Sequence, residues 1–98
     1  MFKENPNITG TSFYGLTVYA SQKQLEKLFG KPQHNDNTGE DKTNIEWNLS
    51  FNDINFTVYD WKEYRKIKKT EIIAWNIGGN SKEDTNKILK EINNRLNG

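Results

Sequence analysis

The chain has 98 residues, which is enough for one domain with one modest core. It contains no cysteine, and this excludes disulfides, thiolate catalysis and zinc–thiolate sites. The formal net charge of +1 gives no global field that would draw the protein onto nucleic acid or a membrane surface. The sequence shows neither an apolar run long enough to span a bilayer nor the apolar core of a signal peptide, so we expect a cytoplasmic protein.

The first third of the chain predicts an arm, a strand and a short helix. Residues 1–9 show no periodicity and are expected to form a flexible N-terminal arm, with a dimer-exchange arm as the alternative. Residues 10–20 alternate as a strand does, and Gly15 within them is typical of a bulge or a close backbone approach. Residues 21–24 match a capping box, which predicts a helix over 22–29.

The middle of the chain predicts a β-hairpin. Residues 33–43 are polar and form a loop that separates the helix from the next strand. A strand follows over 44–51, a tight turn over 52–53, and a second strand that continues to Trp61. The apolar side of these two strands consists of Ile45, Trp47, Leu49, Phe51, Ile54, Phe56 and Val58.

The last third predicts a basic connection, a strand and a long helix. Residues 62–70 hold five basic residues and one acid. Residues 71–77 are apolar on both sides, which favours a central strand covered on both faces. The chain then breaks at 78–80, and a helix with Ser81 as its N-cap continues to about residue 96.

This order of elements predicts the fold class. We expect a two-layer α+β domain over residues 10–98, with the order β-α-β-β-β-α. Its sheet should have four strands, mainly antiparallel, with both helices packed on one face.

Aromatic and basic residues gather where the second hairpin strand ends. Aromatic faces can stack on bases, and arginine can both stack and contact phosphate. Glycines before a helix start expose backbone N–H groups that can hold phosphate, although these lack the spacing of known nucleotide motifs. We place both stretches in one candidate ligand-binding site at adjacent strand ends: Tyr59, Trp61, Lys62, Tyr64, Arg65, Trp75, Gly78, Gly79, Asn80 and Ser81.

The remaining polar residues have a structural interpretation. His34 is the only histidine and is expected on the surface, and one histidine without cysteine makes no ordinary transition-metal site. Asp60 and Glu63 lie close in sequence to basic residues, which favours structural pairing over acid–base catalysis. In particular, Asp60 could orient Arg65 by a bidentate contact.

Two resemblances accompany these patterns. Residues 21–50, with Leu28-Phe29-Gly30-Lys31-Pro32 and Trp47, look like the repeat of β-lactamase-inhibitor proteins, which are binding modules without catalysis. Most of the chain resembles a family of small bacteriophage accessory proteins, and this implies a phage or prophage origin without a mechanism. The blocks that carry the second resemblance are Gly10-Thr11-Ser12, Leu28-Phe29-Gly30-Lys31-Pro32, Asp41-Lys42, Glu46-Trp47, Thr57-Val58-Tyr59-Asp60-Trp61-Lys62-Glu63-Tyr64-Arg65 and Trp75-Asn76-Ile77-Gly78-Gly79.

Together these observations predict a non-enzymatic, phage-encoded counter-defence protein that sequesters a nucleotide-type immune signal. We expect no cofactor or metal, and a homo-oligomer with the site at a subunit interface, because so small a chain cannot easily enclose a ligand. A protein–protein inhibitor of a host defence enzyme, of the anti-CRISPR kind, is the alternative. An enzyme is disfavoured because no nucleophile–base pair is recognisable. General DNA or RNA binding is disfavoured because the charge is balanced.

Overall fold

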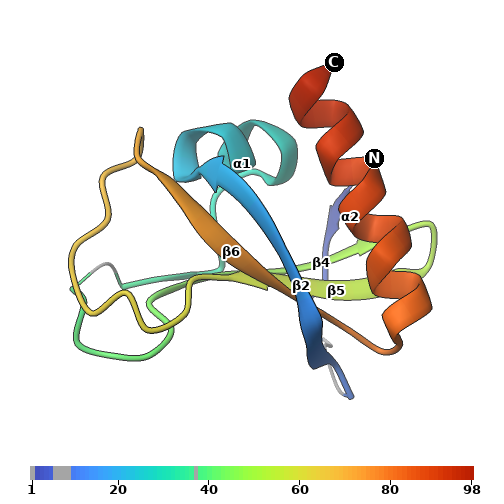
Figure 1. Cartoon of the computed structure of the whole chain (residues 1–98), viewed down its shortest axis with the longest axis horizontal. Helices are drawn as coiled ribbons and strands as arrows, with labels where there is room; N and C mark the ends of the chain where they lie inside the picture. The colour runs from blue at the N-terminus through green and yellow to red at the C-terminus, as the bar shows by residue number, and fades with distance from the viewer. Residues whose placement is uncertain (1, 6–9, 37) are drawn as a thin grey trace.

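The computed structural model describes residues 2–5, 10–36 and 38–98 of the chain. Within them the chain forms six strands and two helices (Figure 1). Their bounds are β1 Lys3–Glu4, β2 Ser12–Ser21, α1 Gln22–Phe29, β3 His34–Asn35, β4 Ile45–Phe51, β5 Ile54–Tyr59, β6 Ile72–Gly79 and α2 Lys82–Asn97.

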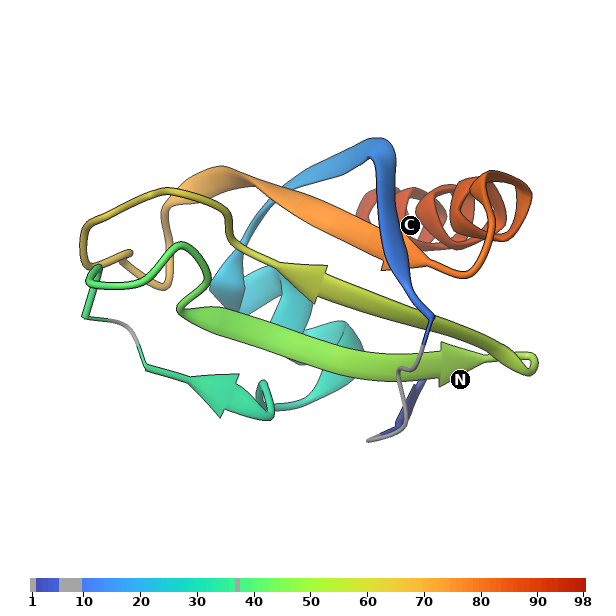
Figure 2. The same ribbon diagram turned by 90° about the horizontal axis from the view of Figure 1, so that it is seen from below.

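All six strands belong to one antiparallel sheet. The main path runs β1-β4-β5-β6-β2, and β3 pairs with β4 as well. Figure 2 shows the strands in front of both helices, so the helices cover one face and the other face is open. The α+β class with two helices on one face is therefore confirmed, with six strands where the sequence predicted four.

The two additional strands lie along the same edge of β4. Lys3 of β1 pairs with Ser50, and His34 of β3 pairs with Glu46. Each strand is only two residues long, which is too short for an alternating pattern to reveal. The predicted polar loop 33–43 thus begins with a short strand.

Local sequence signals fix the ends of α1 and the position of the bulge. Ser21 and Gln24 form the full capping box, with N···O distances of 2.9 and 3.1 Å, and the helix spans the predicted residues. Gly30 ends the helix at φ 82°, a region that favours glycine. Gly15, at φ 84°, lies within the predicted bulge, where the β2–β6 register shifts between Phe13 and Thr17.

The β4–β5 connection is a two-residue hairpin turn. Asn52 and Asp53 have φ angles of 50° and 65°. Positive φ at both central residues is the type I′ geometry, which matches the twist of paired strands. The turn sets the register in which Phe51 faces Ile54 and Trp47 faces Val58.

The core lies between the sheet and the helices. Its centre is an edge-to-face contact between Trp47 and Trp75, whose ring centroids are 5.4 Å apart. Both indole N–H groups donate to backbone carbonyls, of Gly30 at 2.8 Å and of Ala20 at 2.9 Å. The helices add buried side chains to this cluster: Leu25, Ile88 and Ile92.

Strand β6 lies inside the sheet, between β5 and β2, as predicted. The prediction that both of its faces are covered is wrong for the start of the strand. Ile73, Trp75 and Ile77 face the helices and are buried, whereas Ile72 on the other face is 58% exposed. Ile72 is thus a surface residue, whereas Asn76 and Gly78 farther along the same face are buried.

The N-terminal arm is packed where the structure describes it. Phe2 is 8% exposed and lies with its ring centroid 5.0 Å from those of both Phe29 and Phe51. Where the sequence predicted a flexible arm, residues 2–5 are thus packed and paired, while residues 1 and 6–9 lie outside the described part. No helix in the described chain has the length and apolar character needed to cross a membrane.

Candidate functional site

The structure separates most residues of the two stretches that were predicted to form one site. Strands β5 and β6 are antiparallel, and Tyr59 at the end of β5 pairs with Asn76 in the middle of β6. Gly79 pairs with Phe56, three residues or about 10 Å of extended strand before Tyr59. The end of β5, where Trp61 follows, and the end of β6 therefore lie at opposite ends of the sheet, and the prediction of adjacent strand ends is wrong.

Packing and capping account for the glycine-rich stretch. Gly78 and Gly79 are buried residues of β6, although the sequence predicted a break there. A Cβ on Gly79 would lie 2.3 Å from Thr85 Oγ1, so glycine lets α2 approach the strand. The Ser81 hydroxyl accepts from the Asp84 N–H at 3.1 Å, and Asp84 and Glu83 place negative charge at the helix start. These carboxylates disfavour a phosphate at that point.

Two further predicted residues are engaged elsewhere. Trp75 is fully buried on the helix side of the sheet, so its ring is not available for stacking on a ligand. Arg65 forms a bidentate pair with Glu71 and not with Asp60. This hydrogen bonding raises the pKa of Arg65 and lowers the pKa of Glu71. The guanidinium thus already has a carboxylate partner.

Trp61 and Tyr64 remain on the surface. Trp61 is 46% exposed, meets Tyr59 edge-to-face at 6.2 Å, and has the Lys62 ammonium 5.7 Å from its ring centroid. Tyr64 is 54% exposed. Lys62 and Tyr64 have positive φ angles of 55° and 50°, which are uncommon for residues other than glycine. Such backbone angles are frequent at ligand and partner contacts.

The open face of the sheet carries two transverse rows of side chains. Cross-strand pairing aligns Glu46 with Tyr59, Tyr59 with Asn76, and Asn76 with Thr17. His34 of β3 extends this row on the other side of Glu46. The neighbouring row consists of Asn48, Thr57, Gly78 and Phe13.

A hollow of about 160 Å³ lies where these rows meet β2. The missing side chain of Gly78 leaves room for the Thr57 hydroxyl, since a Cβ on Gly78 would lie 2.5 Å from Thr57 Oγ1. Tyr59 and Gly78, one from each predicted stretch, both line the hollow. Tyr59 joins it to the exposed Trp61 ring. The residues that line the hollow are Thr11, Ser12, Phe13, Glu46, Thr57, Tyr59 and Gly78.

The polar groups of this face are held in a partly desolvated setting. Burial raises the pKa of Glu46, an effect that His34 and a hydrogen bond from Asn48 oppose. Burial also raises the pKa of Tyr59, opposed by its hydrogen bond with Asn76. Perturbed groups that converge on a hollow are a feature of ligand sites. We therefore place the candidate site here, with Glu46, Tyr59 and Thr57 as its polar groups.

The sequence prediction missed Glu46, Thr57 and Phe13. Glu46 and Thr57 stand at polar positions of strands whose other side is apolar, a pattern that also describes any solvated strand face. Their convergence depends on the register of four strands, and Phe13 joins them across the sheet. The useful signal would have been a carboxylate and a tyrosine in one predicted cross-strand pair.

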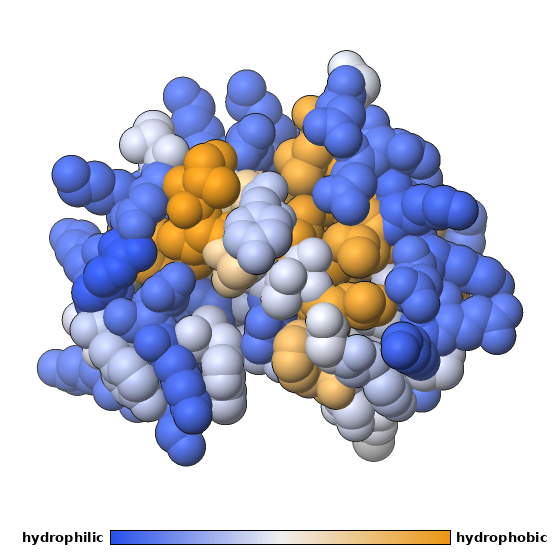
Figure 3. All heavy atoms as spheres, in the orientation of Figure 1, coloured by the Kyte–Doolittle hydropathy of each residue, from blue (hydrophilic) through white to orange (hydrophobic). Residues whose placement is uncertain are grey.

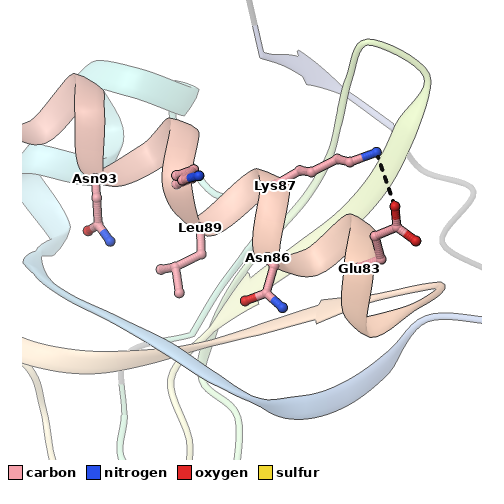
Figure 4. A pocket seen from close by; sticks show the side chains of 6 residues that line it. Glu83, Asn86, Lys87, Leu89 and Asn93 are labelled. Atoms are coloured by element: carbon pink, nitrogen blue, oxygen red, sulfur yellow. Dashed lines mark ion pairs between the residues drawn. The ribbon is translucent and has the colours of Figure 1, made fainter.

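A larger groove, of about 480 Å³, lies on the flank of α2 (Figure 4). It surrounds Leu89 with side chains of Asn86, Lys87, Lys90 and Asn93, and Glu83 pairs with Lys87 at its end. We favour the smaller hollow as the ligand site because chemically perturbed groups converge there. Among the described residues, no group of three or more His, Asp or Glu side chains could hold a metal ion.

Comparison with known proteins gives no relative for the chain: no family model, no curated protein and no solved structure matches it. The resemblances to phage accessory proteins and to the inhibitor repeat therefore stay predictions.

Proposed function

We propose that the protein is a non-catalytic binding protein that takes a nucleotide-type ligand on the open face of its sheet. The observation that carries this proposal is the convergence of Glu46, Thr57 and Tyr59 on one hollow beside an exposed tryptophan. The resemblance to phage proteins supplies a biological setting, in which the protein would sequester a nucleotide immune signal of the host.

The chemistry of the hollow suits a base with N–H donors. An ionised Glu46 is an acceptor, and half-burial strengthens its hydrogen bonds. The Tyr59 and Thr57 hydroxyls can donate or accept, so they can adapt to the other polar edges of a base. Phe13, half-exposed at the rim, offers an aromatic face.

The rest of the nucleotide would lie outside the hollow. Ligand pockets commonly measure ~300–1,000 Å³, so this hollow can receive only part of such a molecule. From Tyr59 the surface leads to Trp61 and to Lys62 above it. We propose that Trp61 stacks on a second flat group and that Lys62 contacts phosphate.

A thermal-shift screen tests this proposal. The panel contains cyclic di- and trinucleotides, cyclic ADP-ribose isomers and mononucleotides. A ligand at ~100 times its Kd adds about 2.7 kcal/mol of stability. For a domain of this size that raises the melting temperature by roughly 10 °C or more. A flat response across the panel would contradict the proposal.

Point variants then test the site. Glu46→Gln keeps the side-chain size but removes the charge, and should weaken binding by roughly 10- to 100-fold, the value of a charge-assisted hydrogen bond. Tyr59→Phe should weaken binding by about 2- to 10-fold, the value of a neutral one. Tyr64→Phe, the same change outside the hollow, is the matched control and should bind as the wild type does.

A protein–protein inhibitor is the second candidate function. It is favoured by exposed aromatic and aliphatic side chains beyond the hollow, namely those of Tyr19, Tyr64 and Ile72. Apolar side chains that join into a contiguous exposed patch commonly mark partner contacts. A protein that ignores the whole nucleotide panel but forms a stable complex with one host defence enzyme would establish this function instead.

A further inference from the structure

Strand β2 is a long edge of the sheet. It spans ten residues, and β6 is the one strand among the described residues that pairs with it. The other side of β2 therefore presents main-chain N–H and C=O groups that no described strand uses. Such an edge is a template for another strand.

This edge lacks the features that usually prevent pairing. Its sequence, Ser-Phe-Tyr-Gly-Leu-Thr-Val-Tyr-Ala-Ser, contains no charged residue and no proline, whereas 28% of the chain is charged. The opposite edge carries Lys3, Glu4 and His34 on two-residue strands. Short strands and charges protect sheet edges, and β2 has only the bulge at Gly15 as protection.

Apolar surface accompanies the edge. Tyr19, in the regular part of β2 after the bulge, is 73% exposed. In the view of Figure 1, β2 lies in front of the rest of the sheet. Figure 3 shows the same view, with apolar side chains gathered in its middle. In Figure 4, Leu89 of α2 points toward β2, so the groove on α2 lies next to this edge.

Both ends of β2 carry charges of both signs, with Lys87 paired to Glu83 at one end and Lys69 paired to Glu26 at the other, each at 3.7 Å. The Tyr14 hydroxyl donates to the Asn80 carbonyl at 3.2 Å, which places the start of α2, with Glu83 and Asp84, at the start of β2. The Lys23 N–H donates to the Lys69 carbonyl at 2.9 Å, which places basic residues at the end of β2. Because each end carries both signs, no single-sign field opposes an antiparallel pair of β2 strands.

We propose that β2 pairs with β2 of a second copy of this chain, antiparallel about a two-fold axis near Tyr19. A two-fold axis places each residue near it opposite the same residue of the second copy. A charged residue there would face a like charge, which destabilises strand pairing. Strand β2 contains no charged residue, so it avoids this repulsion. The regular stretch Thr17–Ser21 centres on Tyr19, whose ring then packs against its counterpart. The paired strands join the two sheets into one. This inference does not depend on the proposed ligand.

The solution mass of the wild-type chain is the first test. Sedimentation equilibrium between about 1 μM and 1 mM covers the dissociation constants of weak to moderate dimers. We expect a mass that rises to twice that of the chain. A mass that stays at that of one chain at the highest concentration would overturn the proposal. Pairing of β2 with a strand of another protein, without self-association, would overturn it as well.

Charged variants at Tyr19 test the geometry. Tyr19→Lys and Tyr19→Glu each set two like charges across the axis and should weaken self-association by more than about tenfold. An equimolar mixture of the two should associate again, as a mixed dimer. Tyr64→Lys, at another exposed tyrosine that lies off the edge, should dimerise as the wild type does. Dimerisation of Tyr19→Lys at wild-type strength, or a mixture that stays monomeric, would overturn the antiparallel arrangement.

Amide hydrogen exchange gives a readout that needs no variant. Exchange of the outward-facing amides of Thr17–Ser21 should slow as the protein concentration rises, whereas amides of the β4–β5 hairpin should keep their rates. Exchange on β2 that is independent of concentration would contradict edge pairing even if the mass doubled.

Discussion

The carboxylate of Asp60 accepts a hydrogen bond from the backbone N–H of Asn44 at 2.8 Å, sixteen residues earlier in the chain. A second bond at 2.8 Å comes from the Ile45 N–H, and the Asn44 side-chain amide lies 3.4 Å from the other carboxylate oxygen. Asp60 is fully buried, so it joins the start of β4 to the end of β5 beneath Trp61. The exposed aromatic stretch is thereby fixed to the sheet by a residue that cannot reach a ligand.

Asp60→Ala should destabilise the protein by about 2–5 kcal/mol, because two buried N–H groups lose their acceptor at ~1–3 kcal/mol each. Urea denaturation measures the loss. Asp36→Ala, the same change at an exposed position, should stay within about 0.5 kcal/mol of the wild type. Equal losses of unfolding free energy for the two substitutions would show that the hydrogen bonds of Asp60 do not stabilise the fold.

Gly79→Ala should destabilise the protein by about 1–3 kcal/mol, the usual cost of overpacking. The added Cβ would lie 2.3 Å from Thr85 Oγ1, which itself donates to the Ser81 carbonyl. Thr85→Ala should rescue part of this loss, so the double variant should be more stable than the sum of the single effects predicts. A double-mutant cycle by thermal denaturation gives the coupling, and strict additivity would argue against the close approach of α2 to β6.

Glu46→Gln should stabilise the protein increasingly as the pH rises. Burial raises the folded-state pKa of Glu46 above its ordinary value of 4.5, so ionisation costs stability in the folded wild type. Below pH 4.5 the group is protonated in both states and no cost exists. The cost develops as the pH rises through the folded-state pKa, and glutamine escapes it.

Melting temperatures of the wild type and Glu46→Gln between about pH 4 and pH 8 test this sign. The melting temperature of Glu46→Gln minus that of the wild type should grow with pH. The new amide can add a contribution to this difference, but that contribution does not change with pH. Glu40→Gln, on the surface, is the matched control and should show a smaller slope. A difference that shrinks with rising pH would mean that the folded protein favours the ionised form.

Phe2→Ala should cost about 2–4 kcal/mol in spite of its place near the chain start. The ring packs against Phe29, Phe51 and Phe56, and its loss leaves a cavity among them. Phe13→Ala, at a half-exposed ring, should cost less than about 1 kcal/mol. Urea denaturation of both variants at low protein concentration compares them, and equal losses would contradict the packing of the arm.

The parts of the fold that short stretches determine were predictable. The capping box at Ser21, the turn at Asn52 and the bulge at Gly15 depend on neighbouring residues only, and all three appear in the structure. Strands β1 and β3 could not be predicted, because each consists of two residues whose partners are distant in the chain.

The candidate site was less predictable because it depends on register. Trp75 shares its strand face with Ile73 and Ile77, so its burial followed from the same alternation that identified β6. An antiparallel meander also implies that the end of β5 lies away from the end of β6, which separates Trp61 from the glycines. Glu46 and Tyr59 come together only when the pairing of β4 with β5 is known to the residue.

The two short strands that share the outer edge of β4 have a consequence for assembly size. They occupy that edge with one strand after the other, so within the described chain β2 is the one long edge that a neighbour could extend. A chain with one free sheet edge can pair with one other chain, and the resulting dimer has no free long edge left for a third chain. Association through β2 would therefore terminate at two molecules, and growth into a filament would require β1 or β3 to detach first.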